Sequence, residues 1–389
     1  MANKKPASFW LRTPVWDGFW ILSGVWLPIP LIALSSADQV LQVVLICSVF
    51  LLWLPHRFAT VYNAFCTPAY RELVFLKKKR FLALPALIFA STFLFVFAPR
   101  TVLPLDSFTR IQVLATVFFL YNSYHFAMQH YGVLSIYRIR AGQPHSGWLK
   151  RYERIYCVSV GMVMVAFAQI CHGAEVVQDS ILYEIVPGKS LQPALGVLRV
   201  LMPILVVGFT LVMLLGELKS KRRSPSKVIY VLGVGFQGVL AYFLSPLSFL
   251  ILWGVQHWLV SVALAGHMAE NDPSESPAHS RWYGFWNRFN RGFWPTVFGL
   301  CVLTVILAPF FEYTLHYEKI KTAPRFLSWV GDLVENSLVF NFFIALNFAS
   351  VYVHFAMDRA VFRFSDPEIR RVTGPLLFAK KILPNSSST

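Results

Sequence analysis

Long apolar runs follow one another along almost the whole of this 389-residue chain. A helix of about 20 apolar residues crosses a hydrocarbon layer about 30 Å thick. Because 56% of the residues are hydrophobic and they are spread evenly, the composition excludes a soluble globule. We therefore expect an all-α, polytopic bundle in which residues 1–389 form a single integral-membrane domain. The ten expected spans are 18–34, 40–60, 81–98, 110–135, 155–172, 193–217, 228–244, 247–268, 293–311 and 337–357.

The positive charge of the chain predicts how these spans are oriented. Thirty-five Lys and Arg against 19 Asp and Glu give a net charge of +16. Most of the excess lies in short loops, where it meets lipid headgroups on the cytoplasmic side and gives no reason to expect nucleic acid as a partner. If ten helices alternate, both termini are cytoplasmic and the chain is a multi-pass protein of the inner membrane. The charges on that side are Lys4, Lys5 and Arg12, then 77–80, Arg138, Arg140, Lys150, Arg151, Arg154, 219–223, Arg281, Arg288, Arg291, Arg359, Arg363, Arg370 and Arg371.

Other sequence signals are weaker. The first apolar run lacks a small-residue cleavage site, so we expect a retained helix rather than a removed signal peptide. Five cysteines stand singly without a CxxC pair, which indicates neither a zinc knuckle nor a disulfide framework. The polar loop 269–280 is expected to be mobile and the tail 380–389 disordered. We find no P-loop, GxSxG or HExxH motif.

Histidines supply the main indication of function. Six lie in or beside four of the apolar runs, on spans that all end at the cytoplasmic face of the expected topology. An imidazole within hydrocarbon is costly, and several at one membrane face indicate a functional centre. We interpret the six as candidate metal ligands, although any one of them could instead be a hydrogen-bonded packing residue. They are His56, His125, His130, His257, His267 and His354.

The helical rise separates these histidines into two expected levels. At about 1.5 Å per residue, His125 and His257 lie roughly 20 Å inside the nearest flanking charge, and the other four are shallower. His257 and His267 are about 15 Å apart on one helix, so they cannot bind the same ion. The six would therefore serve two ions only if that helix bends.

Polar residues accompany the histidines at helical spacing. Asn122 and Gln129 share a stripe with His125, and Asn347 and Asp358 share a stripe with His354. Asp358 lies one turn beyond His354, where its carboxylate could bind the metal or orient the imidazole. The two Asn and Gln129 are expected to support the ligands through hydrogen bonds.

Imidazole and carboxylate ligands without thiolates favour iron, as one or two ions with positions open for O2. This chemistry predicts a membrane oxidoreductase acting on a lipid or isoprenoid that enters from the bilayer. An electron-donor protein could then be a partner, docking at Arg370 and Arg371, although membrane topology alone explains those charges.

Two alternatives of other classes stay open. His125 and His257 could ligate a b-type haem axially for electron transfer, with a second haem or a quinone near the shallower histidines. A transporter could use helices broken at Pro28, Pro30 and Pro246.

The histidine pattern resembles that of integral-membrane histidine-cluster oxygenases, a group that includes fatty-acid desaturases and hydroxylases and bacterial carotene-cleaving dioxygenases. The resemblance implies a non-haem iron centre that acts on an acyl chain or isoprenoid. It rests on clustered histidines over about four helices. The sequence lacks the HxxxH and HxxHH boxes of desaturases, and its nearest equivalent is His125 and His130 at a spacing of five.

Overall fold

The computed structural model describes residues 9–143, 148–163, 192–273, 281–286, 292–308 and 337–378. Every regular element in these ranges is a helix, in agreement with the expected all-α class. Cys47, Cys66, Cys157 and Cys301 are free thiols. The tail 380–389, most of the polar loop 269–280 and Cys171 lie outside the described residues.

Each of the ten apolar runs coincides with helix in the described ranges. The first run is three short helices, and the second is continuous from Asp38 to Cys66 through a π-helical turn. Only the first part of the fifth run, as far as Val163, is described. The helices of the ten runs are α1 (Pro14–Trp20), α2 (Ser23–Trp26), α3 (Pro28–Ala33), α4 (Asp38–Ser48), η1 (Val49–Trp53), α5 (Leu54–Cys66), η3 (Lys79–Ala83), α7 (Leu84–Phe97), α8 (Ser107–Arg140), α9 (Trp148–Tyr156), η4 (Cys157–Val163), α13 (Gln192–Leu218), α14 (Pro225–Leu240), α15 (Pro246–Glu270), α17 (Phe293–Ala308) and α20 (Ser337–Val361).

Fewer than ten of these helices have the length and hydropathy of a membrane span. Five do, and the pair α1 and α2–α3, which is bent by 64°, makes a sixth if it is one span. Helices α14 and α17 are apolar but have only 16 residues each. The chain thus has the helices of a membrane protein. The five spans are Asp38–Cys66, Lys79–Phe97, Gly196–Leu218, Leu247–Glu270 and Leu338–Val361.

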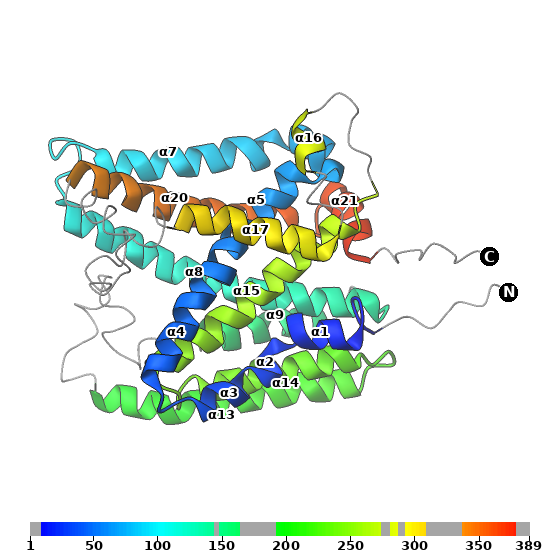
Figure 1. The fold of residues 1–389 in the computed structure, drawn as a ribbon. Coiled ribbons are helices and arrows are strands. Elements are labelled where there is room, and N and C mark those ends of the chain that lie inside the picture. Colours follow the sequence, from blue (N-terminus) through cyan, green and yellow to red (C-terminus); the bar gives the residue numbers. More distant parts are fainter. Residues whose placement is uncertain are drawn as a thin grey trace.

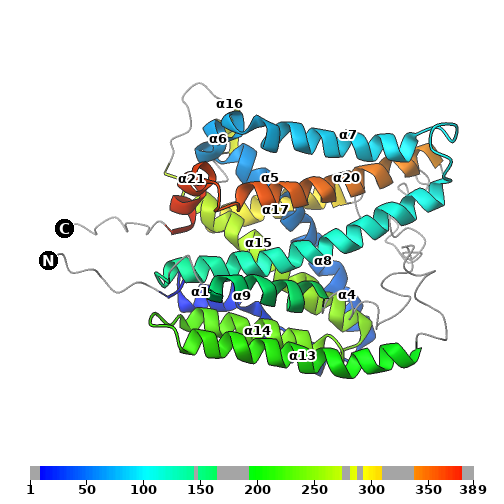
Figure 2. The ribbon, with the colours of Figure 1, turned by 180° about the vertical axis from the view of Figure 1, so that it is seen from behind.

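Helix α15 lies at the centre of the bundle. In its apolar window 78% of the residues are buried, against 17–44% in the other four spans. Figure 1 shows α15 and the continuous α4–α5 helix running obliquely through the middle of the molecule. Helices α7, α20 and α17 lie on one side of them and α9, α13 and α14 on the other, with α8 between, as the reverse view in Figure 2 also shows. Residues of α5, α8, α15 and α20 can therefore meet in the core.

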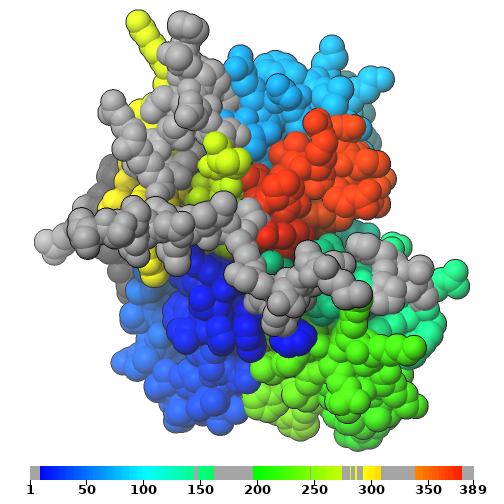
Figure 3. Space-filling view, turned by 90° about the vertical axis from the view of Figure 1, so that its right-hand side faces the viewer, coloured from blue at the N-terminus to red at the C-terminus, as the bar shows by residue number. Residues whose placement is uncertain are grey.

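The first and last described helices lie at the same end of the bundle. Figure 3 views that end and shows α1 beside α15, with α21 (Pro367–Phe378) next to the segment that leads into α7. Helix α21 is fixed there because the hydroxyls of Tyr70 and Thr373 are 2.7 Å apart and Asn271 donates to the Leu376 carbonyl at 2.9 Å. This arrangement agrees with termini on one side of a membrane.

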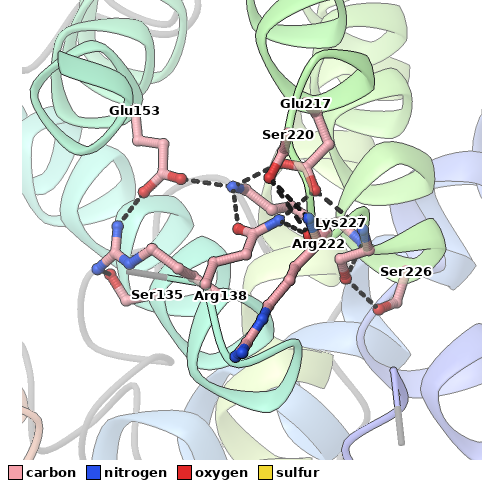
Figure 4. A network of polar contacts seen from close by, with 10 residues as sticks. Ser135, Arg138, Glu153, Glu217, Ser220, Arg222, Ser226 and Lys227 are labelled. Carbon is pink, nitrogen blue, oxygen red and sulfur yellow. Dashed lines mark hydrogen bonds and ion pairs between the residues drawn. The ribbon is translucent and has the colours of Figure 1, made fainter. Parts of the chain in front are cut away.

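A buried ion network joins α8, α9, α13 and α14 (Figure 4). The Lys227 ammonium lies 2.5 Å from the Glu153 carboxylate and 2.8 Å from that of Glu217, and Arg138 pairs with Glu153. Gln143 accepts a hydrogen bond from Lys227 at 3.0 Å and donates to Glu217 at 2.5 Å. The interpretation of Arg138 as a loop charge was wrong, because this side chain is buried in the last turn of α8 and its charge is balanced within the protein.

Candidate metal centre

The backbone segment before His56 is a π-helical turn, η1, followed by Leu54 and Pro55. Pro55 has no N–H, so it cannot bond the carbonyl four residues earlier. That carbonyl, of Leu51, accepts instead from the Cys301 thiol of α17 at 3.5 Å. Single π-turns within helices shift the register of the side chains that follow and are frequent at functional sites. Here the turn η1 ends three residues before His56, which then points into the bundle core.

Four of the six candidate histidines meet in the core. His56 of α5, His125 of α8, His257 of α15 and His354 of α20 each offer a ring nitrogen, and these four atoms lie within 4.8 Å of one another. The ring of His56 is 4.3 Å from that of His354 and 4.5 Å from that of His257, centre to centre. We call these four residues the histidine cluster.

The histidine cluster unites residues that we expected at two levels. His125 and His257 were expected deep in the membrane, whereas His56 and His354 were expected near its surface. Because α4–α5 and α15 cross the bundle obliquely, positions at different distances from their helix ends can reach one point (Figure 1). The estimate from sequence assumed parallel helices, and the tilt makes it fail for these four residues.

All four rings are buried, and each keeps at least one nitrogen without a hydrogen-bond partner. Their exposed fractions are 1% for His56, 7% for His125, 1% for His257 and 1% for His354. Both ring nitrogens of His257 lack any such partner, as do both of His56. Buried polar atoms are normally hydrogen-bonded, and an orphaned one costs about 1–3 kcal/mol. A cation bound among the rings would use these lone pairs.

Asp358 lies at the edge of the histidine cluster. One carboxylate oxygen is 3.4 Å from Nε2 of His125, and the other is 3.6 Å from Nδ1 of His354. A carboxylate in this place can hold an imidazole in one tautomer and direct the opposite nitrogen toward a metal. The structure therefore places Asp358 beside two of the four candidate ligands.

The three predicted polar neighbours have different surroundings. Gln129 donates to the backbone carbonyl of His257 at 3.1 Å and to the Ser261 hydroxyl at 2.7 Å, so it ties α8 to α15 at the cluster. Asn122 lies one turn before His125 on α8, and its side-chain oxygen is buried without a hydrogen-bond partner. Asn347 accepts from a buried arginine, Arg57.

Arg57 was missed in the sequence analysis. Its guanidinium is 2% exposed, donates to the Asn347 side chain at 3.2 Å and lies 4.8 Å from the centre of the Trp53 ring. A positive charge directly after His56 and within an apolar run is itself a signal, because a buried intramembrane charge is kept only for a function or a structural pair.

His130 and His267 lie outside the histidine cluster and have partners of their own. Nδ1 of His130 shares a 2.7 Å hydrogen bond with the Tyr230 hydroxyl, which links α8 to α14. Nε2 of His267 lies 3.0 Å from the Leu377 carbonyl of α21. These contacts give each ring a structural role between helices.

Aromatic side chains enclose the histidine cluster. Phe126 stacks on His257 with ring centres 3.7 Å apart and on Trp253 with centres 4.0 Å apart. The ring of Phe355 lies 4.8 Å from that of His125, and the ring of Trp53 lies 5.5 Å from that of His56. These rings form an apolar wall around the candidate ligands. Such a wall keeps bulk water from the centre.

Comparison with known proteins gives no further guide to the site, since no protein family, curated protein or solved structure matches this chain.

Proposed function

We propose that the protein is an integral-membrane, metal-dependent oxidoreductase whose metal is bound by the histidine cluster. The observation that carries the proposal is the meeting of four buried imidazoles, from four different helices, with their nitrogens within 4.8 Å of one another. Packing alone gives no reason to bring four such rings together, because each buried nitrogen without a partner costs free energy.

The spacing of the nitrogens supports a single ion. With metal–nitrogen bonds of about 2.0–2.1 Å, two ligands of one ion are at most about 4.2 Å apart. The observed limit of 4.8 Å is only slightly wider. Small ring rotations would bring all four nitrogens onto one ion, whereas His130 and His267, which the earlier two-ion hypothesis needed, are engaged elsewhere.

The ligand set and its surroundings support iron and oxygen chemistry. Neutral imidazoles without thiolates suit iron, copper or zinc. A buried centre surrounded by aromatic rings is a poor place for hydrolysis, which consumes water, and suits the reaction of O2 with an apolar substrate. We propose Fe(II), which would supply one-electron and O2 chemistry when bound. Asp358 would orient His125 and His354, and the aromatic wall would exclude water from the reacting atoms.

The haem alternative fits the geometry less well. A haem held between His125 and His257 needs room for a porphyrin between these rings. Their centres are only 5.0 Å apart, and the His56 ring lies 4.5 Å from His257 in the same space. A transporter would not require four converging imidazoles.

The topology belongs to the same proposal. We infer ten spans, with both termini and helix α21 on the cytoplasmic side of the inner membrane. The loop charges and the shared position of α1 and α21 at one end of the bundle support this topology. An electron-donor protein and a lipid or isoprenoid substrate would complete the reaction.

Metal analysis of the purified full chain tests the proposal. We expect about one iron per chain by elemental analysis, with no Soret band in the visible spectrum because no haem is present. Zinc in place of iron would overturn the oxidoreductase assignment. The absence of every transition metal after expression with iron supplied, or a Soret band, would overturn the proposed site.

Asp358→Asn tests the orienting carboxylate. The amide can still accept a hydrogen bond but carries no charge, so we expect iron affinity to fall by about 10–100-fold, which is typical when a partner of a metal-bound histidine is changed. Competition with a chelator measures the affinity. An unchanged affinity would show that Asp358 does not act on the ligands.

A further inference from the structure

A groove on the surface of the bundle lies beside the histidine cluster. Its volume is about 690 Å³, and it is lined by residues of α7, α8 and α20. Helix α7 is only 17% buried over its apolar window, so this side of the bundle faces the surrounding lipid. A volume of this size falls in the range typical of sites for small ligands.

The middle of the groove is apolar. Its lining includes Leu84, Ile88, Phe95, Val113 and Val117. Three of the four hydroxyls in the lining, those of all but Tyr121, donate to backbone carbonyls. Those of Ser91 and Thr92 both donate to the Ile88 carbonyl, and that of Tyr352 donates to the Leu114 carbonyl at 2.6 Å. Such a surface suits a hydrocarbon chain and offers little to a polar ligand.

One end of the groove carries arginines. Arg80 lies in η3, just before α7. Arg359 lies in the last turn of α20 and Arg363 lies two residues beyond the end of that helix, which is next to the start of α7 (Figure 2). Arg80 is already engaged by Asp366 at 3.0 Å, as is Lys77 at 3.4 Å. Desolvation alone would raise the pKa of Asp366, but these two cations hold that pKa below its ordinary value. Arg359 and Arg363 are exposed, and neither has an ion-pair partner among the described residues.

Phe355 connects the groove with the histidine cluster. Its side chain lines the groove, while its ring lies 4.8 Å from the His125 ring. Phe355 is one turn from Arg359, or roughly 6 Å along α20. Arg363 follows two residues after that helix ends at Val361. If the polar end of a hydrocarbon-chain ligand lies at these arginines, an inner part of its hydrocarbon chain passes Phe355.

We propose that this groove binds an amphiphile with one apolar chain and an anionic headgroup, with the headgroup at Arg359 and Arg363 and the chain passing Phe355. Binding follows from the charge and apolarity of the groove. That this amphiphile is also the substrate rests on the proposed function of the histidine cluster. In that case the substrate is an anionic single-chain lipid and not a neutral isoprenoid hydrocarbon.

Equilibrium binding of tritiated palmitate to the purified full chain in a neutral detergent tests the headgroup site. In the Arg359→Gln/Arg363→Gln variant we expect affinity to fall about 25-fold, because each cation near a lipid surface contributes about a factor of five. The matched control is Arg370→Gln/Arg371→Gln, which removes two exposed arginines of α21 that do not line the groove. Equal losses in both variants would overturn the headgroup site.

A second variant tests the chain site. Ala356 lines the groove, and Ala356→Trp should fill part of it and weaken palmitate binding at least tenfold. Elution volume and helicity by circular dichroism check that the variant is folded. Binding of palmitate by a folded Ala356→Trp protein as tightly as by the wild type would overturn the groove. Equal binding of methyl palmitate, or displacement of palmitate by an equal concentration of phosphatidylglycerol, would overturn the anionic single-chain ligand.

The same binding measurement separates this proposal from that of the metal. A His257→Ala protein should bind palmitate as the wild type does even where its metal is lost. A wild-type protein that binds palmitate but no metal would refute the metal centre and leave the groove supported. A wild-type protein that binds metal but no palmitate would refute the groove alone.

Discussion

Replacing His257 by alanine is expected to remove the metal from the purified protein. His257 is 1% exposed, belongs to the central helix α15 and has both ring nitrogens free of hydrogen bonds. Loss of a group that merely orients a ligand costs about 10–100-fold in metal affinity, so loss of the ligand itself should cost about 100-fold or more. Elemental analysis after dialysis against a weak chelator should show iron falling from about one per chain to below about a tenth.

Two further variants show whether such a loss comes from the ligand. The His257 ring also stacks on Phe126, and alanine would leave a cavity there. His257→Phe keeps an aromatic ring at this position but offers no ligand, and it should lose the metal as alanine does. His130→Phe removes an imidazole from outside the histidine cluster, where the partner is the Tyr230 hydroxyl, and should retain the metal. Retention by both His257 variants would refute the proposed centre.

Replacing Lys227 by methionine is expected to destabilise the fold by about 3–5 kcal/mol, the usual cost of removing one partner from a buried ion pair. Lys227 is fully buried between Glu153 and Glu217. Glu153 would keep Arg138, but the remaining donors to Glu217 are neutral, namely Gln143 at 2.5 Å and the Ser224 amide at 2.9 Å. The free energy of unfolding in detergent, measured by denaturant titration, should fall accordingly.

The double variant Lys227→Met/Glu217→Gln identifies the cause. If the unpaired Glu217 carboxylate is what destabilises the single variant, removing its charge should recover a large part of the lost stability. A single variant within about 1 kcal/mol of the wild type would show that the network contributes little, as exposed ion pairs do. A double variant no more stable than the single one would place the cost elsewhere in the network.

The histidine cluster could be predicted in part. All four members were predicted as candidate ligands because an imidazole within hydrocarbon is costly. Asp358 was predicted with them because it lies one helical turn beyond His354. The same criterion also selected His130 and His267, whose rings have helix-linking hydrogen bonds instead. A ligand and a hydrogen-bonded packing residue look alike in sequence, because both are polar groups in an apolar helix that need a partner.

Charged residues show where interpretation from loops fails. Two basic residues, Arg138 and Lys227, and the acidic Glu153 lie near the ends of apolar runs. The positive-inside rule accounts for a basic residue at such a position without any contact inside the protein. In the fold these side chains turn inward and, together with Glu217, neutralise one another. Arg57 likewise belongs to the core, and only its contact with Asn347 of α20 shows why its charge is tolerated there.

Local physical chemistry was enough to establish that the chain is an all-helical membrane protein with histidines in its apolar helices. Hydropathy, helix rise and side-chain cost act along a single segment, so the amino-acid order carries them directly. Which histidines meet depended on the oblique crossing of α4–α5 and α15, on the π-turn before His56 and on the tilt of α8 and α20. These features arise from packing between segments far apart in the chain, and only the tertiary structure decides them.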